Sequence, residues 1–181
     1  MSRALAVSVS PISATSPSPI SQALAAAALA RRLAQRGDAH LSIALLCQAL
    51  RLAPAAPLLD SAERWLTAEA LRPLGARPLQ RLAFTLASLA AAIPERGDSG
   101  RLLNLRAGLR LLGHSRALHP QEAALYLGEA FVRDKLGDDE GKLAVARSAL
   151  EQLPRHWPGH VLLRRLVQRP CERARPFAVA S

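Results

Sequence analysis

The sequence predicts an all-α protein built from antiparallel helix pairs that stack side by side. Half of the 181 residues are hydrophobic, and most of these are Ala and Leu, which favour helices. No stretch alternates β-branched and polar residues as a strand does. The third observation is an internal repeat, because two segments 100 residues apart share landmark residues at the same spacing. A recurring unit of about 34 residues is typical of helical repeat proteins.

The repeat is marked in each segment by a Gly-Asp pair, followed by Ala-Leu and then by Pro. The glycine can take the left-handed conformation that ends a helix. The aspartate can cap the next helix, and the proline stops it. Each segment is therefore predicted to form two helices joined by a tight turn. The landmarks are Gly37, Asp38, Ala49, Leu50 and Pro54 in the first segment, and Gly137, Asp138, Ala149, Leu150 and Pro154 in the second.

Eight helices are predicted in order, with turn or capping residues between them. Trp65 is expected to anchor the third helix in the core, and Gly113 is expected to stop the fifth. Gly75 lies twelve residues before Ala87, as in the landmark segments, and this indicates a less regular second unit. The predicted ranges are 21–35, 39–53, 57–72, 77–92, 100–112, 120–136, 139–152 and 158–168.

Three regions are expected along the chain. Residues 1–20 are rich in Ser and Pro and contain no acidic residue, which predicts a disordered tail; an organelle transit peptide or a secretory signal is a less favoured interpretation. Residues 21–168 are predicted to form the helical repeat domain, and 169–181 a basic flexible tail. The longest apolar run, 23–30, is too short for the roughly 18–20 residues that cross a bilayer, so no membrane span is predicted.

The landmarks resemble those of the tetratricopeptide repeat (TPR) superfamily, with degenerate repeats. The resemblance is good over 23–56, fair over 121–156 and weak between them. It implies a short right-handed solenoid of stacked helix hairpins. In the last repeat Lys142 stands where the family has Ala, so its stem must snorkel or the helix pair must splay. The carried-over positions are Ala26, Leu29, Ala30, Leu33, Ser42, Leu46 and Ala49 in the first repeat, and Ala124, Leu127, Gly128, Phe131, Lys142, Ala146 and Ala149 in the last.

The resemblance also implies a concave groove, lined by the first helix of each repeat, that binds a peptide or a helix of a partner protein. A clamp for a C-terminal carboxylate is disfavoured, because Ala27 and Arg31 stand where such family members have Lys and Asn, and Asn104 is the only asparagine. The expected function is a protein–protein interaction module: an adaptor, an assembly factor or a dedicated chaperone, similar in size to small chaperones of bacterial secretion systems. The predicted groove residues are Leu24, Ala27, Arg31, Gln35, Glu122, Leu125, Glu129 and Arg133.

The net charge of +10 comes almost entirely from arginine, since only Lys135 and Lys142 are lysines. Codon bias explains this composition, and an acidic partner is the alternative. A basic helical-repeat RNA-binding protein is therefore the second functional hypothesis, and an organelle-imported assembly factor is the third. The two cysteines, Cys47 and Cys171, do not suggest a disulfide framework, which fits a reducing compartment. A cytoplasmic location is expected, or an organelle after removal of a transit peptide.

No pattern in the sequence predicts an enzyme, a cofactor or a metal site. His156 and His160 are four residues apart, but Pro158 between them starts a helix, so they do not share a helix face. Cys47 lies in the middle of a predicted helix and is expected to pack as a small hydrophobic residue. The Arg-Gly-Asp tripeptides at 36–38 and 96–98 are interpreted as helix boundaries rather than adhesion motifs.

Overall fold

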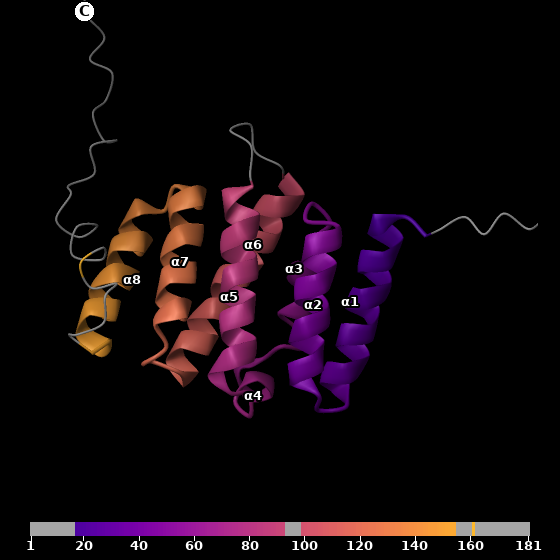
Figure 1. Cartoon of the computed structure of the whole chain (residues 1–181), viewed down its shortest axis with the longest axis horizontal. Coiled ribbons are helices and arrows are strands. Elements are labelled where there is room, and N and C mark those ends of the chain that lie inside the picture. Colours follow the sequence, from indigo (N-terminus) through magenta and orange to yellow (C-terminus); the bar gives the residue numbers. More distant parts are fainter. Residues whose placement is uncertain (1–16, 93–98, 155–160, 162–181) are drawn as a thin grey trace, which may run out of the picture.

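The computed structural model describes residues 17–92 and 99–154, together with residue 161. These residues are helical or lie in turns, and none of them belongs to a strand, so the predicted all-α class is confirmed for this part of the chain. None of the helices in it has the length and apolar character needed to cross a membrane. The helices, shown in Figure 1, are α1 (Pro19–Gln35), α2 (Ala39–Leu52), α3 (Leu58–Ala62), α4 (Ala68–Leu71), α5 (Ala76–Ala91), α6 (Ser99–Leu118), α7 (Ala123–Leu136) and α8 (Asp139–Gln152).

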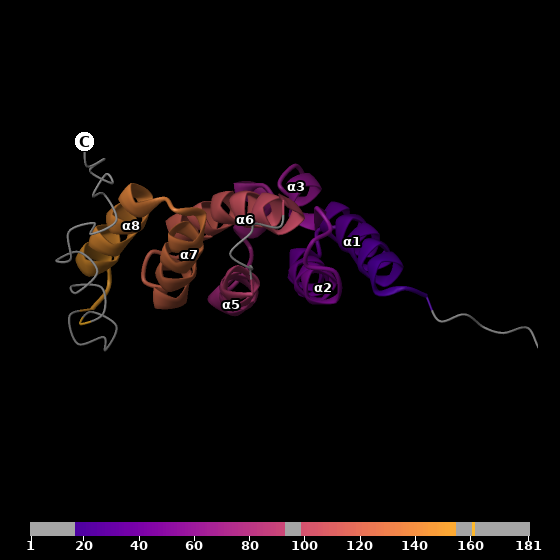
Figure 2. The same ribbon diagram turned by 90° about the horizontal axis from the view of Figure 1, so that it is seen from above.

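The helices form two layers that run the length of the molecule. In the view from above (Figure 2), α2, α5 and α7 stand along one side, and α1, α3, α6 and α8 along the other. Helix α5 contacts α2 on one flank and α7 on the other, and α6 contacts α3, α5 and α7. The chain passes from one layer to the other at nearly every turn, which is how stacked helix hairpins bury their apolar stripes.

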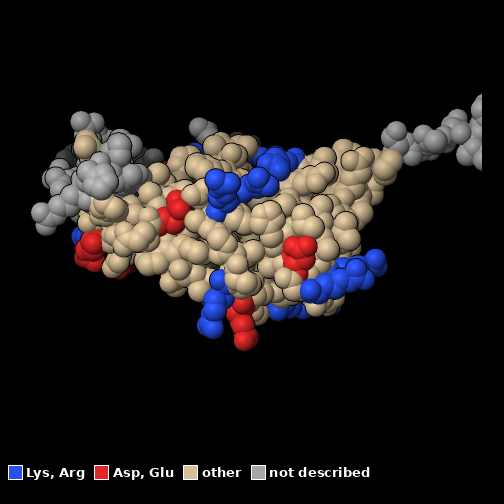
Figure 3. Space-filling view, turned by 60° about the horizontal axis from the view of Figure 1, so that its bottom comes forward, with Lys and Arg blue, Asp and Glu red and all other residues tan. Residues whose placement is uncertain are grey.

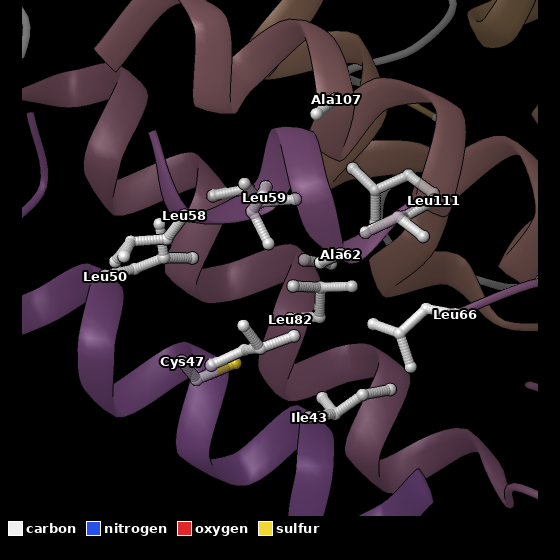
Figure 4. Close-up of a cluster of buried hydrophobic side chains, with 14 of the residues drawn as sticks. Ile43, Cys47, Leu50, Leu58, Leu59, Ala62, Leu66, Leu82, Ala107 and Leu111 are labelled. Carbon is white, nitrogen blue, oxygen red and sulfur yellow. The ribbon is translucent and has the colours of Figure 1, made fainter. Parts of the chain in front are cut away.

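The core lies between the layers and consists mainly of leucine and alanine side chains. Figure 4 shows side chains from α2, α3, α5 and α6 meeting there, and the labelled ones are all nearly or fully buried. Two glycines allow the helices to approach closely. A Cβ added to Gly108 would lie 2.6 Å from the side chain of Leu86, and one added to Gly128 would lie 2.8 Å from that of Ala83. The core side chains labelled in Figure 4 are Ile43, Cys47, Leu50, Leu58, Leu59, Ala62, Leu66, Leu82, Ala107 and Leu111.

The first helix begins two residues before the predicted start. The tail predicted over 1–20 overlaps this helix, because α1 begins at Pro19 and Ser18 caps it by accepting a hydrogen bond from the Ser21 N–H. Proline suits this first position because its missing N–H would have no partner there in any case. The bounds of α2, α5, α7 and α8 agree with the predicted ranges within three residues.

The single helix predicted over 57–72 is wrong, because the structure has two short helices there. The break runs from Glu63 to Thr67, and the Thr67 hydroxyl accepts a hydrogen bond from the Ala70 N–H at the start of α4. A threonine at this position competes for the backbone amides and starts a new helix. Trp65 lies in the break, partly buried against the core.

The predicted stop at Gly113 is also wrong, because α6 continues through this glycine to Leu118. A glycine inside a helix costs only about 1 kcal/mol relative to alanine. The residues beyond it make contacts that offset this cost: the Ser115 hydroxyl is fully buried and bonds to the Leu111 carbonyl, and Leu118 packs against the core. Tertiary packing therefore overrides the local preference for a stop.

The largest difference concerns the register of the last repeat. The matching landmarks aligned α7 with α1, as the first helix of a pair. In the structure α7 stands beside α5, in the layer that contains α2, and α1 lies in the other layer (Figures 1 and 2). The same landmarks therefore occur at turns that cross between the layers in opposite directions.

Candidate functional site

A cavity of about 400 Å³ opens between α1 and the region that follows α3. Its α1 wall follows one face of the helix, since Ala27, Arg31 and Gln35 are each four positions apart. Its opposite wall is formed by Ser61 and the indole of Trp65. Three of the eight predicted groove residues, Ala27, Arg31 and Gln35, line it. The full lining is Ala27, Ala28, Arg31, Arg32, Gln35, Ser61 and Trp65.

The cavity combines an apolar base with a cationic rim. Ala27 and Trp65 are partly buried and pack against the core, whereas Arg31 and Arg32 are exposed. No acidic side chain lines the cavity, and neither arginine forms an ion pair with any residue that the structure describes. Such a site favours a ligand that presents a carboxylate or another anion beside an apolar group.

Asn104 of α6 positions the α3 wall of the cavity. Its side chain is fully buried. The amide oxygen accepts a hydrogen bond of 2.9 Å from the Leu59 N–H, and the amide nitrogen donates to the carbonyls of Pro54 and Ala56 at 3.0 and 2.7 Å. Pro57, the residue before α3, offers no side-chain cap. Asn104 therefore supplies from a distant helix the cap that the local sequence lacks.

The fourth predicted groove residue of α1, Leu24, is 53% exposed but lies outside the cavity lining. Its large exposed side chain lies about two turns from Arg31 on the same helix, which spans about 10 Å. The α1 half of the predicted groove thus consists of a cavity and an exposed leucine beyond it.

The α7 half of the predicted groove does not join this cavity. Leu125 is fully buried and Glu129 is 1% exposed, so neither can present its side chain to a partner. Glu122 is the residue that precedes α7, and Arg133 is partly buried. Figures 1 and 2 place α7 away from α1, with other helices between them. The expectation that these residues line one surface depended on the register that the structure corrects.

Glu129 instead organises a charged network that connects three helices. Its carboxylate accepts hydrogen bonds from Arg116 of α6 at 3.0 Å and from Arg133 of α7 at 2.8 and 3.1 Å. Arg116 also donates to the Ser148 hydroxyl of α8 at 3.2 Å, and its guanidinium lies 5.2 Å from the centre of the Tyr126 ring. These hydrogen bonds satisfy the buried carboxylate and connect α6, α7 and α8.

Arg133 extends this network to the turn between α7 and α8. Its guanidinium donates to the Asp138 carboxylate as well as to Glu129. Burial opposes its charged form, but the hydrogen bonds to Glu129 and Asp138 outweigh this and raise the pKa of Arg133. The Gly141 N–H, and then the Arg133 guanidinium, lower the pKa of Asp138 below its ordinary value. Arg133 is therefore engaged within the molecule.

Two other sequence interpretations are confirmed. Cys47 is fully buried, and burial raises the pKa of its thiol, so it packs as a small hydrophobic residue. The tripeptide at 36–38 is a helix boundary: Gly37 has φ 83° and Asp38 caps α2. The second tripeptide, at 96–98, and His156, His160 and Cys171 lie outside the described residues.

Lys142 follows the snorkelling alternative. Its side chain is 15% exposed, and its ammonium group bonds to Asp134 and Asp139 at 2.7 Å each. These two carboxylates raise the pKa of Lys142. The charge therefore reaches carboxylates at the rim of the α7–α8 pair while the stem is covered.

Sequence reasoning missed four residues of the cavity lining, which are Ala28, Arg32, Ser61 and Trp65. It placed Ser61 and Trp65 on one continuous helix with the tryptophan directed to the core. The signal that could have found them is Thr67, a capping residue that allows the chain to turn between Trp65 and α4. Comparisons with known protein families, with curated proteins and with solved structures found no match to this chain.

Proposed function

We propose that this protein is a TPR-like protein–protein interaction module that holds an acidic peptide segment of a partner in the α1–α3 cavity. The observation that carries the proposal is the composition of the cavity: an indole and alanine base beneath two arginines that have no acidic partner among the described residues. Three of its residues are also groove positions that the family resemblance implies.

The cavity suits a segment that carries an apolar side chain next to a carboxylate. The apolar side chain would contact Trp65 and Ala27, because burying aromatic and aliphatic surface is favourable. The carboxylate would accept bidentate hydrogen bonds from Arg31 or Arg32. The role follows from this chemistry: an adaptor, an assembly factor or a chaperone that recognises short segments of a partner.

Selection from a random peptide display library, followed by affinity measurements on the enriched peptides, tests the proposal. Trp65 provides a direct readout in a Trp157→Phe background, since Trp65 and Trp157 are the two tryptophans of the chain. We expect enriched peptides to contain acidic residues and to change the emission of Trp65. Arg31→Glu should weaken their binding at least about tenfold, the loss of about 1.4 kcal/mol expected for one charge-assisted contact.

Arg147→Glu is the matched control, because Arg147 is an exposed arginine of α8, outside the cavity. It carries the same charge change and should leave the affinity within about twofold. Melting temperatures of both variants should stay close to that of the parent. Peptides that bind the Arg31→Glu variant as tightly as the parent, without a change in Trp65 emission, would show that the cavity is not the binding site.

A further inference from the structure

A second cavity, of about 450 Å³, lies on the opposite layer, between α2 and α5. Its lining includes Arg51, Arg77, Arg81 and Phe84, and it contains no acidic residue. Figure 3 shows Lys and Arg side chains gathered at the upper centre of that view, over α5 and α2. This surface is separate from the α1–α3 cavity, with which it shares no residue.

The neighbours of Phe84 fix its direction. Ala83 contacts Gly128 of α7, and Thr85 lies beside Cys47 of α2. Phe84 lies between these two residues, and successive helix positions are about 100° apart. Its ring therefore points out of the layer, between α2 and α7, where it is 63% exposed. A phenylalanine with so little cover on a packed helix is an uncovered apolar anchor.

Further exposed apolar side chains lie on the helices that flank α5. Leu41 of α2 is 49% exposed, and Leu127 and Phe131 of α7 are 39% and 41% exposed. Leu127 and Phe131 are four residues apart, so they form one stripe along α7. Because Gly128 faces α5, its neighbour Leu127 lies on the outer side of the contact. The outer surface of α2, α5 and α7 thus has apolar residues on both sides of an arginine-rich centre.

The three arginines of this surface lack carboxylate partners among the described residues. Three other arginines are paired, Arg110 with Glu63, and Arg116 and Arg133 with Glu129. Arg77 and Arg81 are one turn apart on α5, and Arg51 of α2 lines the same cavity. Their positive charges therefore lie beside an exposed apolar ring without carboxylate partners. A partner surface that complements them carries both carboxylates and apolar side chains.

We infer that the outer surface of α2, α5 and α7 binds an acidic amphipathic helix of a partner protein, with Phe84 in contact with its apolar face and Arg51, Arg77 and Arg81 paired with its carboxylates. A second copy of this chain is a poor occupant, because the arginines of both copies would meet. The rings of Phe84 and Phe131 can stack on bases, whereas the aliphatic side chains of Leu41 and Leu127 match the apolar face of a helix. We therefore favour a partner helix over a nucleic acid strand.

The test uses a labelled synthetic peptide of 18 residues, designed as a helix with leucines on one face and glutamates on the other. A matched peptide has glutamine in place of every glutamate. Fluorescence anisotropy with the full chain should show at least about tenfold tighter binding of the acidic peptide. The double variant Arg77→Glu, Arg81→Glu and the single variant Phe84→Ser should each weaken this binding at least about tenfold, with little change in melting temperature.

Arg147→Glu is the control, and it should retain the parent affinity. Equal binding of the glutamate and glutamine peptides, or unchanged binding by the Phe84→Ser variant, would overturn the inference. Loss of binding in Arg31→Glu alone would assign the peptide to the α1–α3 cavity instead. Tighter binding of a single strand of twelve thymidine nucleotides than of the acidic peptide would replace the partner helix with nucleic acid. A dimer in sedimentation experiments that Phe84→Ser dissociates would replace it with a second copy of this chain.

Discussion

The turns at Gly37 and Gly137 share one backbone conformation. The two glycines have φ angles of 83° and 72°. In each turn the Asp N–H that follows bonds at 2.9 Å to the carbonyl four residues before the glycine, which belongs to Leu33 in one case and Arg133 in the other. The Asp38 and Asp138 carboxylates then cap the next helix, accepting at 3.1 and 2.9 Å from the N–H three residues on.

The surroundings of the two turns are different. Arg133 occupies the position that Leu33 has in the first turn, and it connects Asp138 to Glu129 and so to α6. Among the described residues, Asp38 has no side-chain ion pair. One turn is held by its backbone and by apolar packing, while the other is also held by a charged network. A Gly-Asp pair therefore determines the turn and leaves open the layer in which its helices stand.

The largest effect is expected from removing the centre of the network. Glu129→Ala leaves Arg116 and Arg133 without their shared carboxylate, and losing one partner of a buried pair costs about 3–5 kcal/mol. Both arginines retain about a quarter of their side-chain exposure, so we expect a value near the lower end. Urea denaturation measures the free energy of unfolding directly.

Leu29→Ala is the matched control at the first turn, because Leu29 precedes Gly37 by the same eight residues that separate Glu129 from Gly137. Leu29 is 47% exposed, so its truncation should cost less than about 1 kcal/mol. Equal losses for the two variants would mean that the network adds nothing to the second turn, and the contrast between the turns would fail.

The glycines themselves should behave alike. Gly37→Ala and Gly137→Ala each force a left-handed conformation on a residue with a Cβ, which costs roughly 1–2 kcal/mol. No atom lies within 4 Å of the added Cβ at either site, so no steric term should separate the two. Thermal denaturation of both variants should show similar decreases in melting temperature. A clear difference would show that the shared backbone is not equally important at the two turns.

The smallest effect concerns the charge of the capping aspartates. Asn retains the capping oxygen, so Asp138→Asn removes only the charge that Arg133 and the Gly141 N–H stabilise. Since these groups lower the pKa of Asp138, its charge stabilises the fold above about pH 4 and this contribution disappears as the pH falls through the lowered pKa. The Asp138 side chain is 40% exposed, so solvent screening limits the loss to about 0.5 kcal/mol near neutral pH.

The pH dependence is the measurement that checks this prediction. Unfolding of the parent and the Asp138→Asn variant should differ at pH 7 and converge in acid. Asp38→Asn provides the comparison, because Asp38 lacks the arginine. A larger loss in Asp38→Asn than in Asp138→Asn would show that Arg133 does not stabilise the charge of the second cap.

The sequence predicts the helical class and most helix bounds because those depend on local residues. Ala and Leu favour helices, and Gly37 and Gly137 adopt the expected left-handed turns. The errors have two sources, tertiary packing and a local cap that the sequence analysis overlooked. The helix α6 passes Gly113 because its later residues are packed, and the helix expected over 57–72 breaks because Thr67 caps a new one.

The candidate site was predictable only where it depends on one helix. Ala27, Arg31 and Gln35 share a face of α1, which periodicity reveals, and all three line the cavity. Pairing them with Glu129 required knowledge of which helices are neighbours, and matched landmarks do not contain that information. Asn104 could be noticed as the single asparagine of the chain, but its partners are 45 to 50 residues away.

Asn104 has a consequence for the order in which parts of the molecule open. Helices α3 and α4 have five and four residues, too few to persist alone in water, and α3 begins at an amide that Asn104 satisfies from α6. Whenever α6 detaches, the segment from Pro54 to Trp65 loses its support. The Leu59 amide should then exchange its hydrogen for deuterium at the rate at which α6 opens. The Trp65 wall of the cavity would be released in the same event, so access to the α1–α3 cavity is coupled to the docking of a helix that does not line it.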